Sequence, residues 1–167
     1  MLIIIAVIML FTVCKDPSTE QNVYEENFDG ITFGMTKEEV ISVLGRDPDS
    51  EHDSENKDGY SMFYDRQIFF DITAHYVYYS FDGNGHLDFI TAHYTYYDES
   101  EKEQMPIDLD HIKEELSKYY PEYPEKTRTY THENEEELSL HTENRRISLS
   151  IYDHSFSVMI TIRDESE

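Results

Sequence analysis

Apolar and polar residues alternate with a period of two through the last third of the chain, which is typical of an antiparallel β-sheet with one buried and one solvated face. We therefore predict strands at 126–132, 137–142, 145–152 and 155–163. The expected buried positions are Leu138, Leu140, Ile147, Leu149, Ile151, Phe156, Val158, Ile160 and Ile162. The expected solvated positions are Ser139, His141, Ser148, Ser150, Tyr152, Ser157, Met159 and Thr161.

A second group of strands is predicted between residues 60 and 97, where aromatic and β-branched residues are dense and Pro is absent. We expect strands over Tyr60–Asp65, Ile68–Phe81 and His86–Tyr97. Between the last two, Asp-Gly-Asn-Gly-His at 82–86 predicts a hairpin with a three-residue loop and Gly85 in the left-handed region.

The two arms of this hairpin repeat each other. Ile72–Tyr79 returns as Ile90–Tyr97, identical at seven of eight positions. With the loop described above, paired residue numbers sum to 168, so His75 is expected to face His93 across the ladder. Both faces of the hairpin are largely apolar, which predicts either a contact surface or a second buried layer on the face away from the helices.

A short helix is predicted before each group of strands. In the first, Thr36 is the expected N-cap and Glu39 closes a capping box, while Gly45 ends the helix. Its apolar face comprises Val40, Ile41 and Leu44. The second is expected to be capped by Asp108 and to end before Pro121. Its apolar face comprises Leu109, Ile112, Leu116 and Tyr119.

The N-terminal residues 2–13 are an uncharged apolar run, too short at about 1.5 Å per residue to cross a hydrocarbon core of about 30 Å. Such a run is typical of a signal-peptide core. No Lys or Arg precedes Leu2, so we expect a basic segment encoded upstream of Met1. The run ends at Cys14, the one Cys of the sequence.

Phe11-Thr12-Val13-Cys14 resembles the lipobox of bacterial lipoproteins, with Val at a position usually held by Gly, Ala or Ser. The resemblance implies that the Cys14 thiol carries a diacylglycerol. It also implies a domain tethered to the membrane outside the cytoplasm, in the envelope of a bacterium.

A second resemblance is carried by Gly34-Met35-Thr36, Glu39-Val40, Leu44-Gly45 and Pro48. This pattern is similar to a motif of small envelope lipoproteins, found in SmpA/OmlA-like outer-membrane assembly lipoproteins and in modules like the β-lactamase inhibitor protein. The resemblance implies an α+β domain with a protein partner and transfers no contact residue.

We therefore predict an α+β fold of two short helices on antiparallel sheet, arranged as two similar tandem halves. The expected segments are a signal peptide (1–14), a polar tether (15–27), a first half (28–97), an acidic connector (98–104) and a second half (105–164).

Asp and Glu number 36 against 13 Lys and Arg, which gives a net charge of −23. So negative a chain is unsuited to the phosphate backbone of nucleic acids. We expect the charge to sit largely in loops, and a protein partner to present a basic contact patch, with association slowed by salt.

No cofactor motif or catalytic constellation stands out, so we expect no enzyme activity, no cofactor and no resident metal. Asp153-His154-Ser155 has the residue types of a triad, but consecutive residues point in different directions, and we interpret them as a turn. Tyr79 and Tyr97, on the expected face of His75 and His93, are our candidate contact residues. Two alternatives stay open: solute or metal binding by the His75/His93 face, and stacking of cell-wall sugars on exposed aromatic rings.

Overall fold

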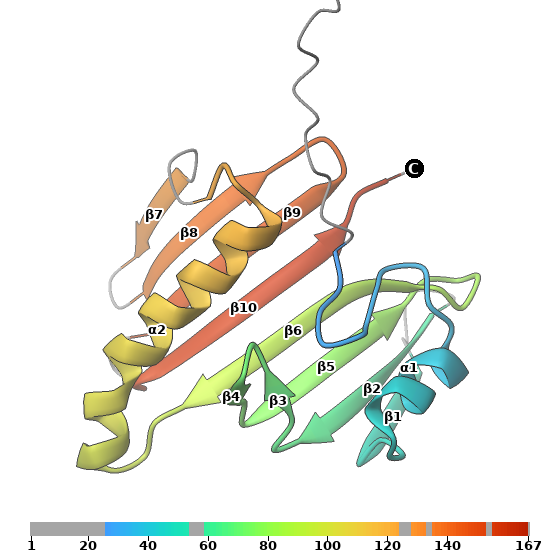
Figure 1. Cartoon of the computed structure of the whole chain (residues 1–167), viewed down its shortest axis with the longest axis horizontal. Coiled ribbons are helices and arrows are strands. Elements are labelled where there is room, and N and C mark those ends of the chain that lie inside the picture. Colours follow the sequence, from blue (N-terminus) through green and yellow to red (C-terminus); the bar gives the residue numbers. More distant parts are fainter. Residues whose placement is uncertain (1–25, 54–58, 124–127, 133–134, 153–154, 167) are drawn as a thin grey trace, which may run out of the picture.

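The structure, a computed structural model, describes residues 26–53, 59–123, 128–132, 135–152 and 155–166. These residues form the predicted α+β fold, in which one antiparallel sheet has the strand order β1-β2-β5-β6-β10-β9-β8-β7 and β3 pairs with β4 in a separate hairpin (Figure 1). The strands are β1 (Ser50–Asp53), β2 (Tyr60–Asp65), β3 (Ile68–Phe69), β4 (Ile72–Thr73), β5 (Tyr76–Phe81), β6 (Leu87–Thr95), β7 (Arg128–His132), β8 (Glu135–His141), β9 (Arg145–Tyr152) and β10 (Ser157–Asp164). The helices are α1 (Lys37–Leu44) and α2 (Glu99–Tyr119).

Each half of the chain supplies one helix followed by four strands of the large sheet. The strand order is mirrored, so that β6 and β10, the last strand of each half, pair at the centre. Their register runs from Ser157 opposite Thr95 to Arg163 opposite Phe89. The two halves therefore share one continuous sheet.

Helix α1 begins and ends as predicted. The Thr36 hydroxyl accepts a hydrogen bond from the Glu39 backbone N–H at 3.4 Å, and the Glu39 carboxylate accepts one from the Thr36 N–H at 2.8 Å. Gly45 caps the C-terminus with a φ of +68°, a conformation that costs glycine little.

Helix α2 begins well before the predicted cap. Asp98 is the N-cap: its carboxylate accepts a hydrogen bond from the Glu101 N–H at 2.9 Å, and Glu101 reaches back to the Asp98 N–H at 3.4 Å. The predicted acidic connector 98–104 is thus the cap and first turns of this helix. Pro106 lies inside the helix with its ring exposed, and it removes the bond to one carbonyl, that of Lys102.

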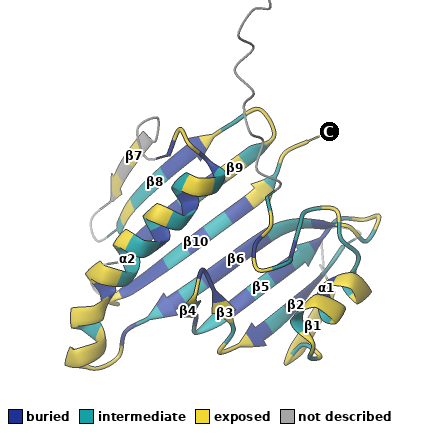
Figure 2. Ribbon diagram, viewed as in Figure 1, coloured by how far each residue is buried: buried dark blue, intermediate teal, exposed yellow. Residues whose placement is uncertain are grey.

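The helices and the β3–β4 hairpin lie on one side of the large sheet, which we call the inner face (Figure 1). Buried residues alternate along the strands beneath them (Figure 2). The central ones are Met62, Tyr64, Val77, Tyr79, Ile90, Tyr94, Leu149, Val158, Ile160 and Ile162. They are covered by Met105, Ile112 and Leu116 of α2 and by Phe28, Ile31, Val40, Phe69 and Phe70. Phe156, predicted to belong to this core, instead lies in the β9–β10 turn and is 38% exposed.

The loop between β5 and β6 forms as predicted. Gly85 has a φ of +83°, and the Asp82 N–H donates to the His86 carbonyl at 2.8 Å. The Asp82 carboxylate also accepts hydrogen bonds from the Asn84 and His86 N–H groups, each at 2.8 Å. These bonds lower the pKa of Asp82.

The register of this hairpin differs from the prediction. The first pair beyond the loop, Phe81 and Leu87, sums to 168, but all later pairs sum to 169 because of a β-bulge. Asp88 is the extra residue, so relative to the later residues of β6 each side chain of β5 points to the face opposite to the one predicted. Tyr76, rather than His75, therefore lies opposite His93.

Candidate binding face

The side of the large sheet away from the helices, which we call the open face, is covered by no described element (Figure 1). Its residues alternate with the buried ones along each strand. They are Ser50, His52, Ser61, Phe63, Asp65, Tyr76, Tyr78, Ser80, Phe89, Thr91, His93, Thr95, Glu135, Glu137, Ser139, His141, Arg146, Ser148, Ser150, Tyr152, Ser157, Met159, Thr161 and Arg163.

Five rings on β2, β5 and β6 form an aromatic strip on the open face: Phe63, Tyr76, Tyr78, Phe89 and His93. The Phe63 ring lies 4.7 Å from Tyr78 and 5.9 Å from Tyr76 between centroids. Tyr76 stacks on His93 at 5.0 Å, and Tyr78 meets Phe89 edge-on at 6.1 Å. All five are partly accessible. The strip therefore offers rigid aromatic area that is already ordered before any ligand arrives.

Small hydroxyl side chains form the floor of the open face. All five buried polar residues of the described chain lie there: Ser61, Thr91, Ser139, Ser150 and Ser157. Ser61 Oγ is 2.5 Å from the Tyr78 hydroxyl, and the hydroxyls of Thr91 and Thr161 lie 3.4 Å apart. Larger neighbours bury these small residues, so most of the accessible area of the face belongs to the rings and the longer side chains.

Few charges lie on this face in spite of the net charge of −23. Its carboxylates are Asp65 at the end of β2 and Glu135 and Glu137 on β8, near one edge. Glu137 accepts a hydrogen bond from Ser148 at 3.0 Å. The strands at the centre, β5, β6 and β10, contribute no carboxylate to the open face within their paired regions apart from the bulge residue Asp88. Apart from Arg163 on β10, the centre of the face is thus weakly charged.

Three of the four predicted contact residues come together at one end of the aromatic strip. Tyr97 is 64% exposed, and its hydroxyl lies 3.3 Å from His75 Nε2. The His75 ring is 5.7 Å from Tyr97 and 6.1 Å from Tyr76, which stacks on His93. Desolvation by burial, and then the charge of nearby His75, lower the pKa of His93.

The prediction of Tyr79 as the fourth contact residue is wrong. Tyr79 is 1% exposed on the inner face, and burial raises its pKa well above the usual value. The predicted His75–His93 pair is also displaced by the bulge. The two residues are joined through the backbone, since the His75 N–H donates to the His93 carbonyl at 2.7 Å, while the His93 ring faces Tyr76.

The described residues contain no candidate metal centre. No group of three or more His, Cys, Asp or Glu side chains there could hold a metal ion. Asp153 and His154 lie outside the described residues, and the Ser155 hydroxyl is 2.7 Å from that of Ser157.

Sequence reasoning missed most of the aromatic strip and a pair of arginines. Tyr76 and Tyr78 were expected on the face opposite to the histidines, because the bulge was not recognised. Arg146 and Arg163 lie opposite each other on β9 and β10. The alternation already noted in these strands places both on the solvated face, so this signal was present in the sequence.

The predicted lipid-anchor segment, with Cys14, lies outside the described residues. Within the part of the chain that is described, no helix is long and apolar enough to cross a membrane. The lipoprotein resemblances therefore stay predictions carried by the motif residues. Comparison of the chain with protein-family models, with curated proteins and with solved structures found no match.

Proposed function

We propose that the chain is a non-catalytic protein-binding module of a bacterial cell envelope, tethered to the membrane through Cys14, and that its contact surface is the open face. The observation that carries the proposal is the aromatic strip, a set of ordered, partly accessible rings that no described element covers. Interfaces are enriched in aromatic residues and depleted of charge at their centre, and rings on rigid strands lose little conformational entropy on binding.

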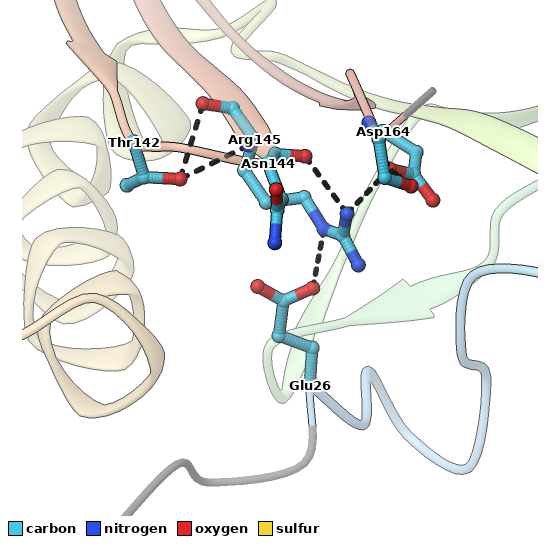
Figure 3. Close-up of polar contacts among 6 residues, drawn as sticks. Glu26, Thr142, Asn144, Arg145 and Asp164 are labelled. Atoms are coloured by element: carbon cyan, nitrogen blue, oxygen red, sulfur yellow. Dashed lines mark hydrogen bonds and ion pairs between the residues drawn. The ribbon is translucent and has the colours of Figure 1, made fainter. Parts of the chain in front are cut away.

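The way the chain enters the domain supports this use of the sheet. Arg145 Nε donates to the Glu26 carboxylate at 2.5 Å, and its Nη1 donates to Asp164 at 2.5 Å and to the Asn144 carbonyl at 2.8 Å (Figure 3). The guanidinium also lies 4.6 Å from the Phe33 ring centroid. Glu26 is therefore fixed at the end of β10, beside Asp164, and is not itself part of the open face.

The net charge of −23 supports a partner whose surface is basic on the whole. Attraction between opposite net charges accelerates encounter and weakens as salt screens it. We expect the association rate to fall as ionic strength rises, while the dissociation rate changes little. An association rate that is independent of salt would contradict this part of the proposal.

Affinity capture from a native envelope extract tests the proposal, with the full chain as bait. The double variant Tyr76→Thr/Tyr78→Thr removes two rings of the strip and replaces them with β-branched residues that suit a strand. The matched control, Ile68→Thr/Ile107→Gln, removes two apolar side chains that are 55% and 61% exposed on β3 and α2, away from the open face. Partner recovery should be lost in the first variant and kept in the control. Equal recovery from both folded variants would overturn the proposal.

A further inference from the structure

We infer that Arg146 and Arg163 form a receptor site for a single carboxylate side chain of the bound protein, an inference that rests on the proposed use of the open face. The two residues are direct partners across β9 and β10. The next strand on one side places His141 opposite Arg146, and the strand on the other side places Phe89 opposite Arg163. This row of four positions contains two guanidinium groups and no carboxylate.

The pair differs from five of the other basic residues of the described chain, whereas Arg66 and Lys113 likewise form no ion pair among the described residues. Lys37, Arg46, Lys102, Lys118 and Arg145 each form an ion pair with Asp or Glu. Arg146 and Arg163 form no ion pair among the described residues, although acidic residues outnumber basic ones by 36 to 13. Like charges directly opposite on neighbouring strands destabilise a sheet, so the arrangement is unfavourable until an anion lies between them.

The surroundings of the pair suit a carboxylate. The Arg163 guanidinium lies 5.0 Å from the Phe89 ring centroid, a cation–π contact that holds it against the aromatic strip. The same shallow pocket is lined by Arg146 and by the hydroxyl side chains of Ser148 and Thr161. A planar guanidinium fork matches the two oxygens of a carboxylate, and the hydroxyl groups add neutral donors.

One carboxylate fits this pocket better than a polyanion does. Glu135 and Glu137 also line it, and the chain as a whole carries −23 charges. A phosphate polymer or nucleic acid would place many negative charges in this field and would be repelled. A single Asp or Glu on an otherwise basic or neutral partner surface would meet two arginines at short range. Aromatic residues of the partner next to that Asp or Glu would pack on the Phe89 end of the strip.

Side-chain NMR of the full chain in neutral detergent tests the inference. The chain has six Arg residues, so Arg-selective ¹⁵N labelling gives few Nε–Hε signals, and substitution assigns them. The probe is N-acetyl-Glu-Phe-amide, and its matched control is N-acetyl-Gln-Phe-amide. We expect saturable shifts at Arg146 and Arg163, with the Gln probe binding about tenfold more weakly because it lacks the charge.

Two double variants have defined outcomes in the same titration. In Arg146→Gln/Arg163→Gln, the preference for the Glu probe should disappear. In Lys113→Gln/Lys118→Gln, which removes two positive charges on α2, it should persist. Equal binding of the two probes, no saturable shift in the millimolar range, or tighter binding of a long polyphosphate at the same arginines would each overturn the inference.

Envelope capture separates this inference from the proposed function. If the arginine variant keeps full partner recovery while Tyr76→Thr/Tyr78→Thr loses it, the carboxylate site is wrong and the contact face stands. If both variants keep full recovery, both proposals fail.

Discussion

Tyr78 and Tyr79 are neighbours on β5 with opposite surroundings. Tyr79 is 1% exposed beneath the covering elements of the inner face, whereas Tyr78 is partly accessible on the open face and meets Ser61. The same contrast holds along β10, where Val158 is buried and Thr161 is partly accessible. Aromatic residues occur on both faces. The inner face is therefore a core, and the open face a contact surface, because the helices and the β3–β4 hairpin cover only the inner face.

Truncation of the two neighbouring tyrosines gives the strongest test of this contrast. Tyr79→Ala should lower the free energy of unfolding by about 3–5 kcal/mol, because it leaves a cavity in a closed core. Tyr78→Ala should cost about 1 kcal/mol, since solvent can reach the space that is left. Urea unfolding with matched m-values measures both. Equal losses would mean that the open face is packed as a second core, which would argue against its use in binding.

Deletion of Asp88 tests the bulge that assigns side chains to the two faces. The shortened strand can keep Leu87 in the core only by turning the rest of β6 over, which would expose Ile90 and bury His93. The less costly outcome leaves the later residues of β6 on their present faces and removes the Leu87 side chain from the core, where it is 1% exposed. We expect a loss of about 2–5 kcal/mol, as for other large buried side chains. Asp88→Gly retains the chain length and is the control. A deletion no more costly than this control would show that the register is set elsewhere.

The elements that local chemistry specifies could be predicted from the sequence. The capping box of Thr36 and Glu39, the C-cap at Gly45 and the loop before His86 depend on residues within a few positions of one another. The alternation in β8, β9 and β10 predicted the two faces of the second half of the sheet. The start of α2 was missed because the charged residues 98–104 were interpreted as a connector, whereas the hydrogen bonds at Asp98 make them the first turns of the helix.

The candidate site could be predicted only in part, because both faces of the first hairpin are apolar. A one-residue shift of β5 against β6 would move Tyr76 to the inner face and Tyr79 to the open face. Because the two faces have similar hydropathy, the alternation of residues cannot decide between the two registers. The choice depends on pairing between β6 and β10, and on the cover supplied by Phe69 and Phe70, both remote in sequence. The histidine and Tyr97 positions were therefore found, but the strip to which they belong was not.

An exchange of isosteric residues tests the two faces with a smaller effect. Val158→Thr on the inner face should cost about 1–3 kcal/mol, because the new hydroxyl is buried at a fully covered position. Thr91→Val on the open face should change stability by less than about 0.5 kcal/mol, since it removes one long contact to Thr161 and suits a strand. Thermal unfolding of the two variants side by side provides the comparison. A larger cost for Thr91→Val than for Val158→Thr would reverse the assignment of the faces.

The smallest expected effect concerns His93, a partly buried polar ring of the aromatic strip. Its pKa is lowered from the usual 6.5, so the unfolded chain binds a proton that the folded chain resists. As the pH falls through about 6.5, this residue should lower the free energy of unfolding, and the loss should end once the pH is below the folded-state pKa. Above pH 7 it should have no effect.

The quantity to measure is the difference between wild type and His93→Gln from pH 8 to pH 5, because protonation of the many carboxylates affects both proteins alike. The variant should gain stability relative to wild type as the pH falls, and His141→Gln, an exposed position on the same face, is the control. A difference that stays constant with pH would mean that His93 is hydrated in the folded state. The end of the aromatic strip near His75 would then be more open to solvent than its ring contacts indicate, and the contrast between the two faces would be greater than proposed.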